Sequence, residues 1–134
     1  MSFPQTDRGT RLLDQNALFG AIISENELYS FAKQTATGTN QATALVTPST
    51  VAIVEITSTP SGSGIQLPLS DPGDRYFVAN NGGATLTVYT SVNETVASPK
   101  INGTAGTTGV TQTNGTNAMY VCMSPGQWYR ISGT

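Results

Sequence analysis

The residues that could carry chemistry are few in this chain, and their spacing favours turns over reaction centres. Asp71 and Asp74 flank Pro72-Gly73, close enough to suggest a carboxylate pair or a calcium loop. A calcium site needs several more oxygen ligands at set spacing, whereas Pro followed by Gly is typical of a type II turn. We therefore interpret both aspartates as turn residues, and we expect neither a metal nor a cofactor.

Nucleophilic catalysis lacks an obvious base in this sequence. The chain has no histidine, and Lys33 and Lys100 stand in no catalytic motif. Ser and Thr are abundant, but a hydroxyl nucleophile needs an adjacent base to activate it. The single cysteine, Cys122, lies in an apolar run and is expected to pack as a small hydrophobe. The sequence predicts a protein that is not an enzyme.

Two adjacent aromatic residues, Trp128 and Tyr129, could form a platform that stacks on a sugar. Alternation along a strand places Trp128 with Arg130 and Tyr129 with Ile131. One aromatic can then be part of the core while the other lies on the surface or at an interface. We favour packing or a subunit interface for this pair, and ligand contact stays open as the alternative.

Composition indicates one folded domain with a neutral polar exterior. Of the 134 residues 37% are hydrophobic and 10% are charged, against roughly 25% charged in ordinary soluble domains. A net charge of −2 gives no basic surface for nucleic acid. No apolar stretch approaches the ~20 residues of a membrane span, and the first residues do not resemble a signal peptide. We expect synthesis in a cytoplasm and no nucleic-acid or membrane partner.

Short apolar segments separated by turn residues make the fold class mainly β. In Gly64–Gly83 a strand, a turn, a second strand and a second turn follow one another, and Asn80-Asn81-Gly82-Gly83 is the strongest hairpin signal. Residues 102–117 are low in complexity, with glycine at every third position from Gly103 to Gly109, and are interpreted as a long flexible hairpin or loop. Strand spacing near ten residues predicts an antiparallel β-sandwich or barrel, jelly-roll-like, over residues 44–134.

The first 43 residues differ from this body. Ser24 and Glu27 have the form of a helix capping box, followed by Leu28 and Phe31 at helical spacing. We interpret residues 1–43 as an N-terminal arm or short helix that serves in attachment or oligomerisation. Its apolar side chains are candidates for docking on a partner or, equally, on the body itself; the attachment candidates are Phe3, Leu12, Leu13 and Phe19.

Two strands, 51–56 and 119–123, carry apolar residues on both faces and need cover on both sides. A single hydrophobic core buries only one of the two faces of each strand. Cover for the other face must come from the N-terminal segment or from another copy of the chain, which predicts a homo-oligomer. The candidate interface residues are Val51, Ile53, Met119, Val121 and Tyr129.

The body resembles a module of tailed-bacteriophage virion proteins, particularly head decoration and head-fibre proteins. The resemblance rests on the order of three stretches: GIQLPLSDPGDRYFVANNGGATLTVY (64–89), the ING segment (101–103) and AMYVCMSPGQWYRI (118–131). It covers residues 44–131, and its motifs are turn and core positions.

This resemblance implies a homotrimeric capsid decoration, or cement, protein. Such a protein is made in the host cytoplasm, lies on the outer capsid surface of the virion, binds the major capsid protein and stabilises the head. The alternative is a receptor- or carbohydrate-binding module of a tail fibre or head fibre, which would use the loop at 102–117 with Trp128 and Tyr129.

Overall fold

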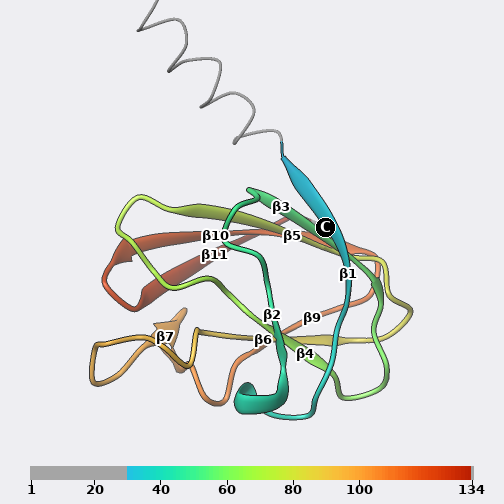
Figure 1. Ribbon diagram of the computed structural model, residues 1–134, viewed down its shortest axis with the longest axis horizontal. Coiled ribbons are helices and arrows are strands. Elements are labelled where there is room, and N and C mark those ends of the chain that lie inside the picture. The colour runs from blue at the N-terminus through green and yellow to red at the C-terminus, as the bar shows by residue number, and fades with distance from the viewer. Residues whose placement is uncertain (1–29, 134) are drawn as a thin grey trace, which may run out of the picture. The chain divides into compact units, whose positions relative to one another are not determined.

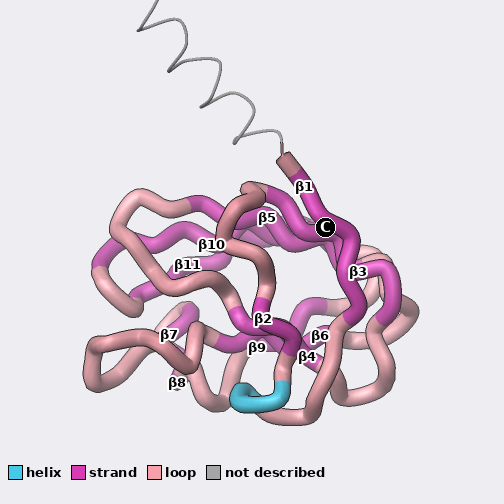
Figure 2. The backbone as a smooth tube through the Cα atoms, in the orientation of Figure 1, coloured by secondary structure: helices cyan, strands magenta, loops and turns pink. Residues whose placement is uncertain are grey.

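The computed structural model describes residues 30–133, which form two β-sheets (Figures 1 and 2). The mainly β class expected from the sequence is confirmed. A single 3-10 turn, η1 (Gln41–Thr43), is the one helical element of the described residues, and none of their helices could cross a membrane. The strands are β1 (Phe31–Thr35), β2 (Leu45–Val46), β3 (Ile53–Ser58), β4 (Gly64–Gln66), β5 (Arg75–Asn80), β6 (Leu86–Tyr89), β7 (Lys100–Ile101), β8 (Thr104–Ala105), β9 (Val110–Gln112), β10 (Thr116–Ser124) and β11 (Gln127–Gly133).

Up to β6 the chain winds in coils that alternate between the two sheets (Figure 1). β1, β3 and β5 are parallel neighbours in a seven-stranded sheet, and β2, β4 and β6 are parallel neighbours in a four-stranded sheet. Each coil thus gives one strand to each sheet. Equivalent positions such as Phe31, Ile53 and Phe77 lie about 20 to 24 residues apart, in the range of solenoid repeats. This part of the chain is a short β-solenoid.

The expectation of an antiparallel sandwich or barrel is therefore wrong. A segment whose sequence predicts a hairpin turn connects strands of two different sheets instead. β5 and β6 flank Asn80-Asn81-Gly82-Gly83 but belong to different sheets, so this segment is no hairpin. The Asn80 side chain is fully buried, accepts from the Gly82 N–H and donates to the Ala84 carbonyl oxygen. These bonds direct the chain across the core instead of back along β5.

Residues 31–43 belong to this body and not to the N-terminal arm that their sequence suggests. β1 pairs with β3 over its whole length, and Ala36 is fully buried in the core. The Gln41 side-chain amide donates to the Thr90 carbonyl oxygen at 2.8 Å, which fixes η1 against the loop after β6. The helical spacing of Phe31 therefore does not continue a helix. The remainder of the arm, residues 1–29, lies outside the described residues.

Antiparallel strands complete both sheets. β10 pairs with β5 and forms a hairpin with β11, and β9 pairs with β6. At the far edge of the seven-stranded sheet, β7 pairs with β11 and β8 with β7. Residues 102–117 are thus not a free loop: the segment contains β8 and β9, and Gln112 is buried.

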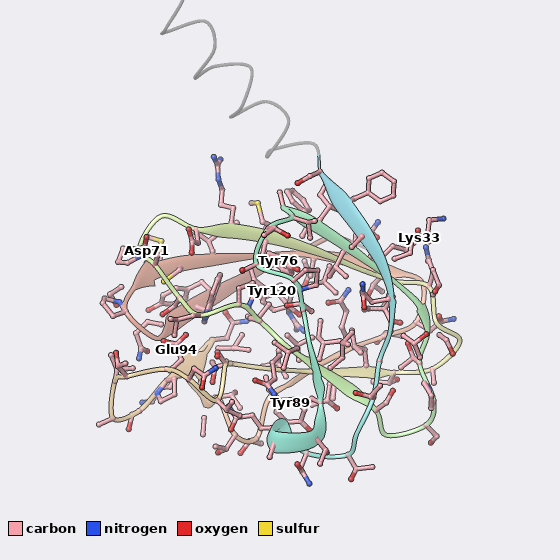
Figure 3. The ribbon with its side chains drawn as sticks, in the orientation of Figure 1. Lys33, Asp71, Tyr76, Tyr89, Glu94 and Tyr120 are labelled. Atoms are coloured by element: carbon pink, nitrogen blue, oxygen red, sulfur yellow. The ribbon has the colours of Figure 1, made fainter. Side chains whose placement is uncertain are left out.

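The core lies between the two sheets and contains both apolar and amide side chains. Its largest members are the rings of Trp128 and Tyr120, and Figure 3 shows Tyr120 between the sheets. The Tyr120 hydroxyl donates to Gln112 Oε1 at 2.9 Å, and burial raises the pKa of this phenol to about 12. The Gln112 amide donates in turn to the Val78 carbonyl oxygen, which joins β9 to β5 across the core.

Candidate interaction surface

The outer face of the seven-stranded sheet carries one apolar side chain on each of five neighbouring strands. We call this set the apolar row; its members pair in register from strand to strand and are Phe31, Ile53, Phe77, Met119 and Ile131. Neighbouring strands are about 4.8 Å apart, so the row extends on the order of 20 Å. Phe31 is 62% exposed, Ile131 58% and Phe77 44%.

Alternation along each strand explains why these side chains face outward. In β5, Tyr76 and Val78 point into the core and Phe77 points away from it. In β10, Ala118 and Tyr120 are buried while Met119 lies between them on the other face. The sequences of these strands are apolar at both phases, so one set fills the core and the other forms a second apolar surface.

A shallow apolar groove lies beside the centre of the row. It has a volume of about 190 Å³ and is lined by Ile53, Phe77, Val78, Ala79 and Asn117. Such a hollow, next to exposed aromatic side chains, offers a socket to a protruding apolar group.

The apolar surface continues beyond the row toward the β10–β11 turn. Val121 is partly buried next to Arg75 and Tyr129, its register partners on β5 and β11. Tyr129 is half exposed, and Met123 near the end of β10 is 65% exposed. The apolar face therefore reaches from β1 to the end of the hairpin.

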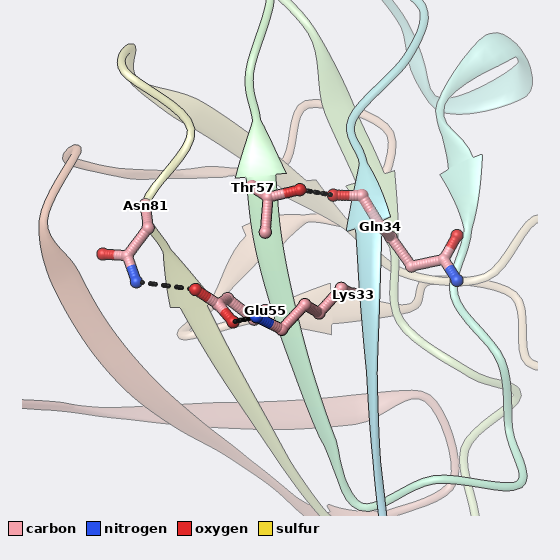
Figure 4. Close-up of polar contacts among 5 residues, drawn as sticks. All are labelled: Lys33, Gln34, Glu55, Thr57 and Asn81. Carbon is pink, nitrogen blue, oxygen red and sulfur yellow. Dashed lines mark hydrogen bonds and ion pairs between the residues drawn. The ribbon is translucent and has the colours of Figure 1, made fainter.

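A polar row borders the apolar row on its other side, and Figure 4 shows its members Lys33, Glu55 and Asn81. Glu55 lies between Lys33 and Asn81: its Oε1 is 3.5 Å from the Lys33 ammonium, and its Oε2 accepts from the Asn81 amide at 3.1 Å. The Asn81 hydrogen bond, followed by the Lys33 charge, lowers the pKa of Glu55. The carboxylate therefore stays ionised and neutralises Lys33, so this border carries little net charge.

Four of the five interface residues expected from the sequence lie on this face. They are Ile53, Met119, Val121 and Tyr129. Val51 precedes β3, is partly buried and packs against the core instead. The expected attachment residues Phe3, Leu12, Leu13 and Phe19 lie outside the described residues.

Three further residues belong to this surface although they are not among the interface residues expected from the sequence: Phe31, Phe77 and Ile131. Phe31 falls in the segment interpreted as an arm, so its place beside Ile53 could not be foreseen. Phe77 lies in the fully apolar run Tyr76–Ala79, and the apolar residues at both phases of that run were the available signal.

The remaining candidates have structural partners in the fold. The Asp74 N–H donates to the Asp71 carbonyl oxygen at 2.9 Å, Gly73 has φ +95°, and Asp74 Oδ2 accepts from the Asp71 N–H, as expected of a turn. In the described part of the chain, no three His, Cys, Asp or Glu side chains gather as a metal site would require. Glu94 accepts from the Ser70 hydroxyl at 2.7 Å, which ties the loop before β5 to the loop after β6.

The aromatic pair is divided between the core and the surface. Trp128 is 1% exposed, so its ring is not available for stacking on a ligand, whereas the Tyr129 ring is half exposed. Cys122, the register partner of Trp128, is buried in the core, and burial raises the pKa of its thiol. Cys122 thus packs as the small hydrophobe that its sequence context predicts.

Comparison of the chain with protein-family models, with curated proteins and with solved structures finds no match.

Proposed function

We propose that this protein is a structural protein of a tailed-bacteriophage virion. It acts by binding alone: it associates with copies of itself as a homotrimer, attaches to the outer surface of the capsid and stabilises the head. The observation that supports this proposal is the apolar row with its continuation to Tyr129 and Met123. Contiguous apolar surface of this extent on a folded body is typical of a protein–protein interface.

The proposal that the larger assembly is a phage capsid comes from the resemblance of residues 44–131 to head decoration proteins. Attachment to the major capsid protein is assigned to the N-terminal segment, through Phe3, Leu12, Leu13 and Phe19. Several copies that bind one shell together gain avidity without a strong contact in any one of them. The sugar-binding alternative has less support, because only Tyr129 of its aromatic pair is exposed and Trp128 is buried.

Counting the protein in virions tests this function. Particles of the phage whose genome encodes the chain are purified, and the ratio of this protein to the major capsid protein is measured by quantitative mass spectrometry. Hundreds of copies per particle are expected of a decoration protein. A handful of copies would instead mean a fibre, and absence from the particle would overturn the proposal.

The attachment segment has its own test. A full-length variant with Leu12→Asp, Leu13→Asp and Phe19→Asp is expected to lose binding to undecorated heads while keeping its oligomeric state. Unchanged co-sedimentation with heads would remove the N-terminal segment from the attachment mechanism.

A further inference from the structure

We infer that the apolar row is the contact between copies of this chain, and that the groove beside Phe77 receives an aromatic side chain of the second copy. This inference rests on the proposed function and assigns the outer sheet face to self-association, leaving attachment to other residues.

The area of the face suits a second folded copy. The five most exposed side chains, Phe31, Phe77, Met123, Tyr129 and Ile131, are between 44% and 65% exposed. Large side chains expose on the order of 200 Å² each, so these five leave roughly 500 Å² of mostly apolar surface. A stable interface buries about 800 Å² per partner, and the partly buried Ile53, Met119 and Val121 with the polar border can supply the rest.

The face is complementary to itself in shape. It carries protruding rings, such as Phe31, on the same surface as the groove lined by Ile53, Phe77 and Ala79. The groove has a volume of about 190 Å³ and a mostly apolar lining, which suits an aromatic ring. On such a surface the protruding ring of one copy can enter the groove of the next, which is the head-to-tail contact that a closed ring of three copies repeats.

The charges on this face also permit two copies to meet. Like charges that face each other across a self-contact repel, and Lys33 on the polar border would be such a charge. Glu55 lies 3.5 Å from its ammonium and is kept ionised by Asn81 and Lys33 together. The ion pair leaves the polar border close to neutral, whereas Arg75, the register partner of Val121 on the opposite side of the row, is a further exposed charge of the face that lies outside this pair.

Sedimentation velocity of the full-length protein at micromolar concentration tests the inference. The wild type is expected to be an oligomer, and Phe77→Glu and Ile131→Glu are each expected to weaken association at least about thirtyfold, as at an interface hot spot. Val46→Glu is the matched control: Val46 is 66% exposed on the four-stranded sheet, and its substitution should leave the oligomer intact. Trp128, the single and buried tryptophan, reports by its fluorescence that each variant has kept its core.

Three results would overturn the inference. They are a monomeric wild type, association unchanged in both folded face variants, and equal loss of association in Val46→Glu. A monomeric wild type would raise the question of what covers the row. If the triple variant Leu12→Asp, Leu13→Asp and Phe19→Asp then binds an apolar dye that the wild type does not bind, the N-terminal segment covers the row instead.

The two proposals fail separately. If the protein is abundant on virions but its self-association is unchanged by Phe77→Glu and by Ile131→Glu, the proposed function stands and this inference fails. An oligomer that depends on Phe77 but is missing from virions would keep this inference and lose the proposed function.

Discussion

The Asn80 side-chain amide donates to the Gln112 carbonyl oxygen at 2.9 Å, and this bond joins the seven-stranded sheet to the four-stranded sheet inside the core. Asn80 uses its whole hydrogen-bonding capacity: Nδ2 also donates to the Ala84 oxygen, and Oδ1 accepts from the Thr59 hydroxyl and the Gly82 N–H. A fully satisfied buried amide is tolerated in an apolar core and fixes one arrangement of the strands around it.

Replacing Asn80 with alanine should strongly destabilise the fold. Asn80→Ala leaves buried backbone acceptors without their donor, and we expect the free energy of unfolding to fall by roughly 3 kcal/mol. Urea unfolding measures the change. Asn81→Ala is the matched control, because Asn81 is exposed and should change stability by less than about 0.5 kcal/mol. Equal effects of the two substitutions would contradict a central role for Asn80.

The Tyr120 hydroxyl should contribute measurably to stability through Gln112. Tyr120→Phe removes a buried donor and leaves Gln112 Oε1 without it, so we expect a loss of about 1 to 2 kcal/mol in the free energy of unfolding. Tyr129→Phe, at a half-exposed ring, is the control and should change stability by no more than about 0.5 kcal/mol. A neutral Tyr120→Phe would mean that the hydrogen bond adds nothing net.

Alkaline pH should destabilise the protein through the same phenol. Burial raises the pKa of Tyr120 to about 12, above its ordinary value near 10. Between these two values the unfolded chain releases a proton that the folded chain retains, so stability falls as pH rises, by at most about 1.4 kcal/mol per pH unit for this group. Urea unfolding at several values across this interval checks the slope. Tyr120→Phe should make this slope less steep. An equally steep slope in that variant would mean that a group other than Tyr120 causes the loss of stability at alkaline pH.

Gly64 should be intolerant of a side chain because of its neighbours on β6. A Cβ atom there would lie 2.6 Å from the Thr87 carbonyl oxygen and from a ring carbon of Tyr89, too close for either. Gly64→Ala should therefore cost about 3 kcal/mol in the free energy of unfolding, at the upper end of what overpacking typically costs. Gly62→Ala is the comparison: its Cβ would meet nothing within 4 Å, and its φ of +78° alone should cost about 1 kcal/mol. Thermal denaturation ranks the two, and the reverse order would argue against close packing at β4.

The sequence was informative about which residues are in strands and which are buried. Leu86 and Val88 alternate with Thr87, and both are buried in β6. The β10–β11 hairpin is also consistent with its sequence, because two apolar segments flank Ser124-Pro125-Gly126, where Gly126 has a φ of +72°.

Strand order could not be read from the same residues. Parallel pairing between coils joins positions distant in sequence, and the side chains that enforce it, such as Gln41 and Asn80, look like ordinary loop residues. Their buried hydrogen bonds exist only after the coils have stacked.

Only part of the candidate surface could be predicted from the sequence, because the rest depends on strand order. Alternation identified Ile53, Met119 and Val121 as side chains that need a second cover. It could not show that Phe31 and Phe77 join them, because that depends on the parallel register of β1, β3 and β5.

The solenoid winding also has a consequence for the order in which the protein folds. The parallel pairing of Phe31 with Ile53 closes about half the length of chain that the pairing of Phe77 with Met119 closes, and the β10–β11 hairpin closes the shortest. The entropy lost on ring closure grows with the logarithm of the enclosed length, by about 0.6 kcal/mol per doubling. The hairpin and the successive coils should therefore form early, and the docking of β10 on β5 should limit the refolding rate.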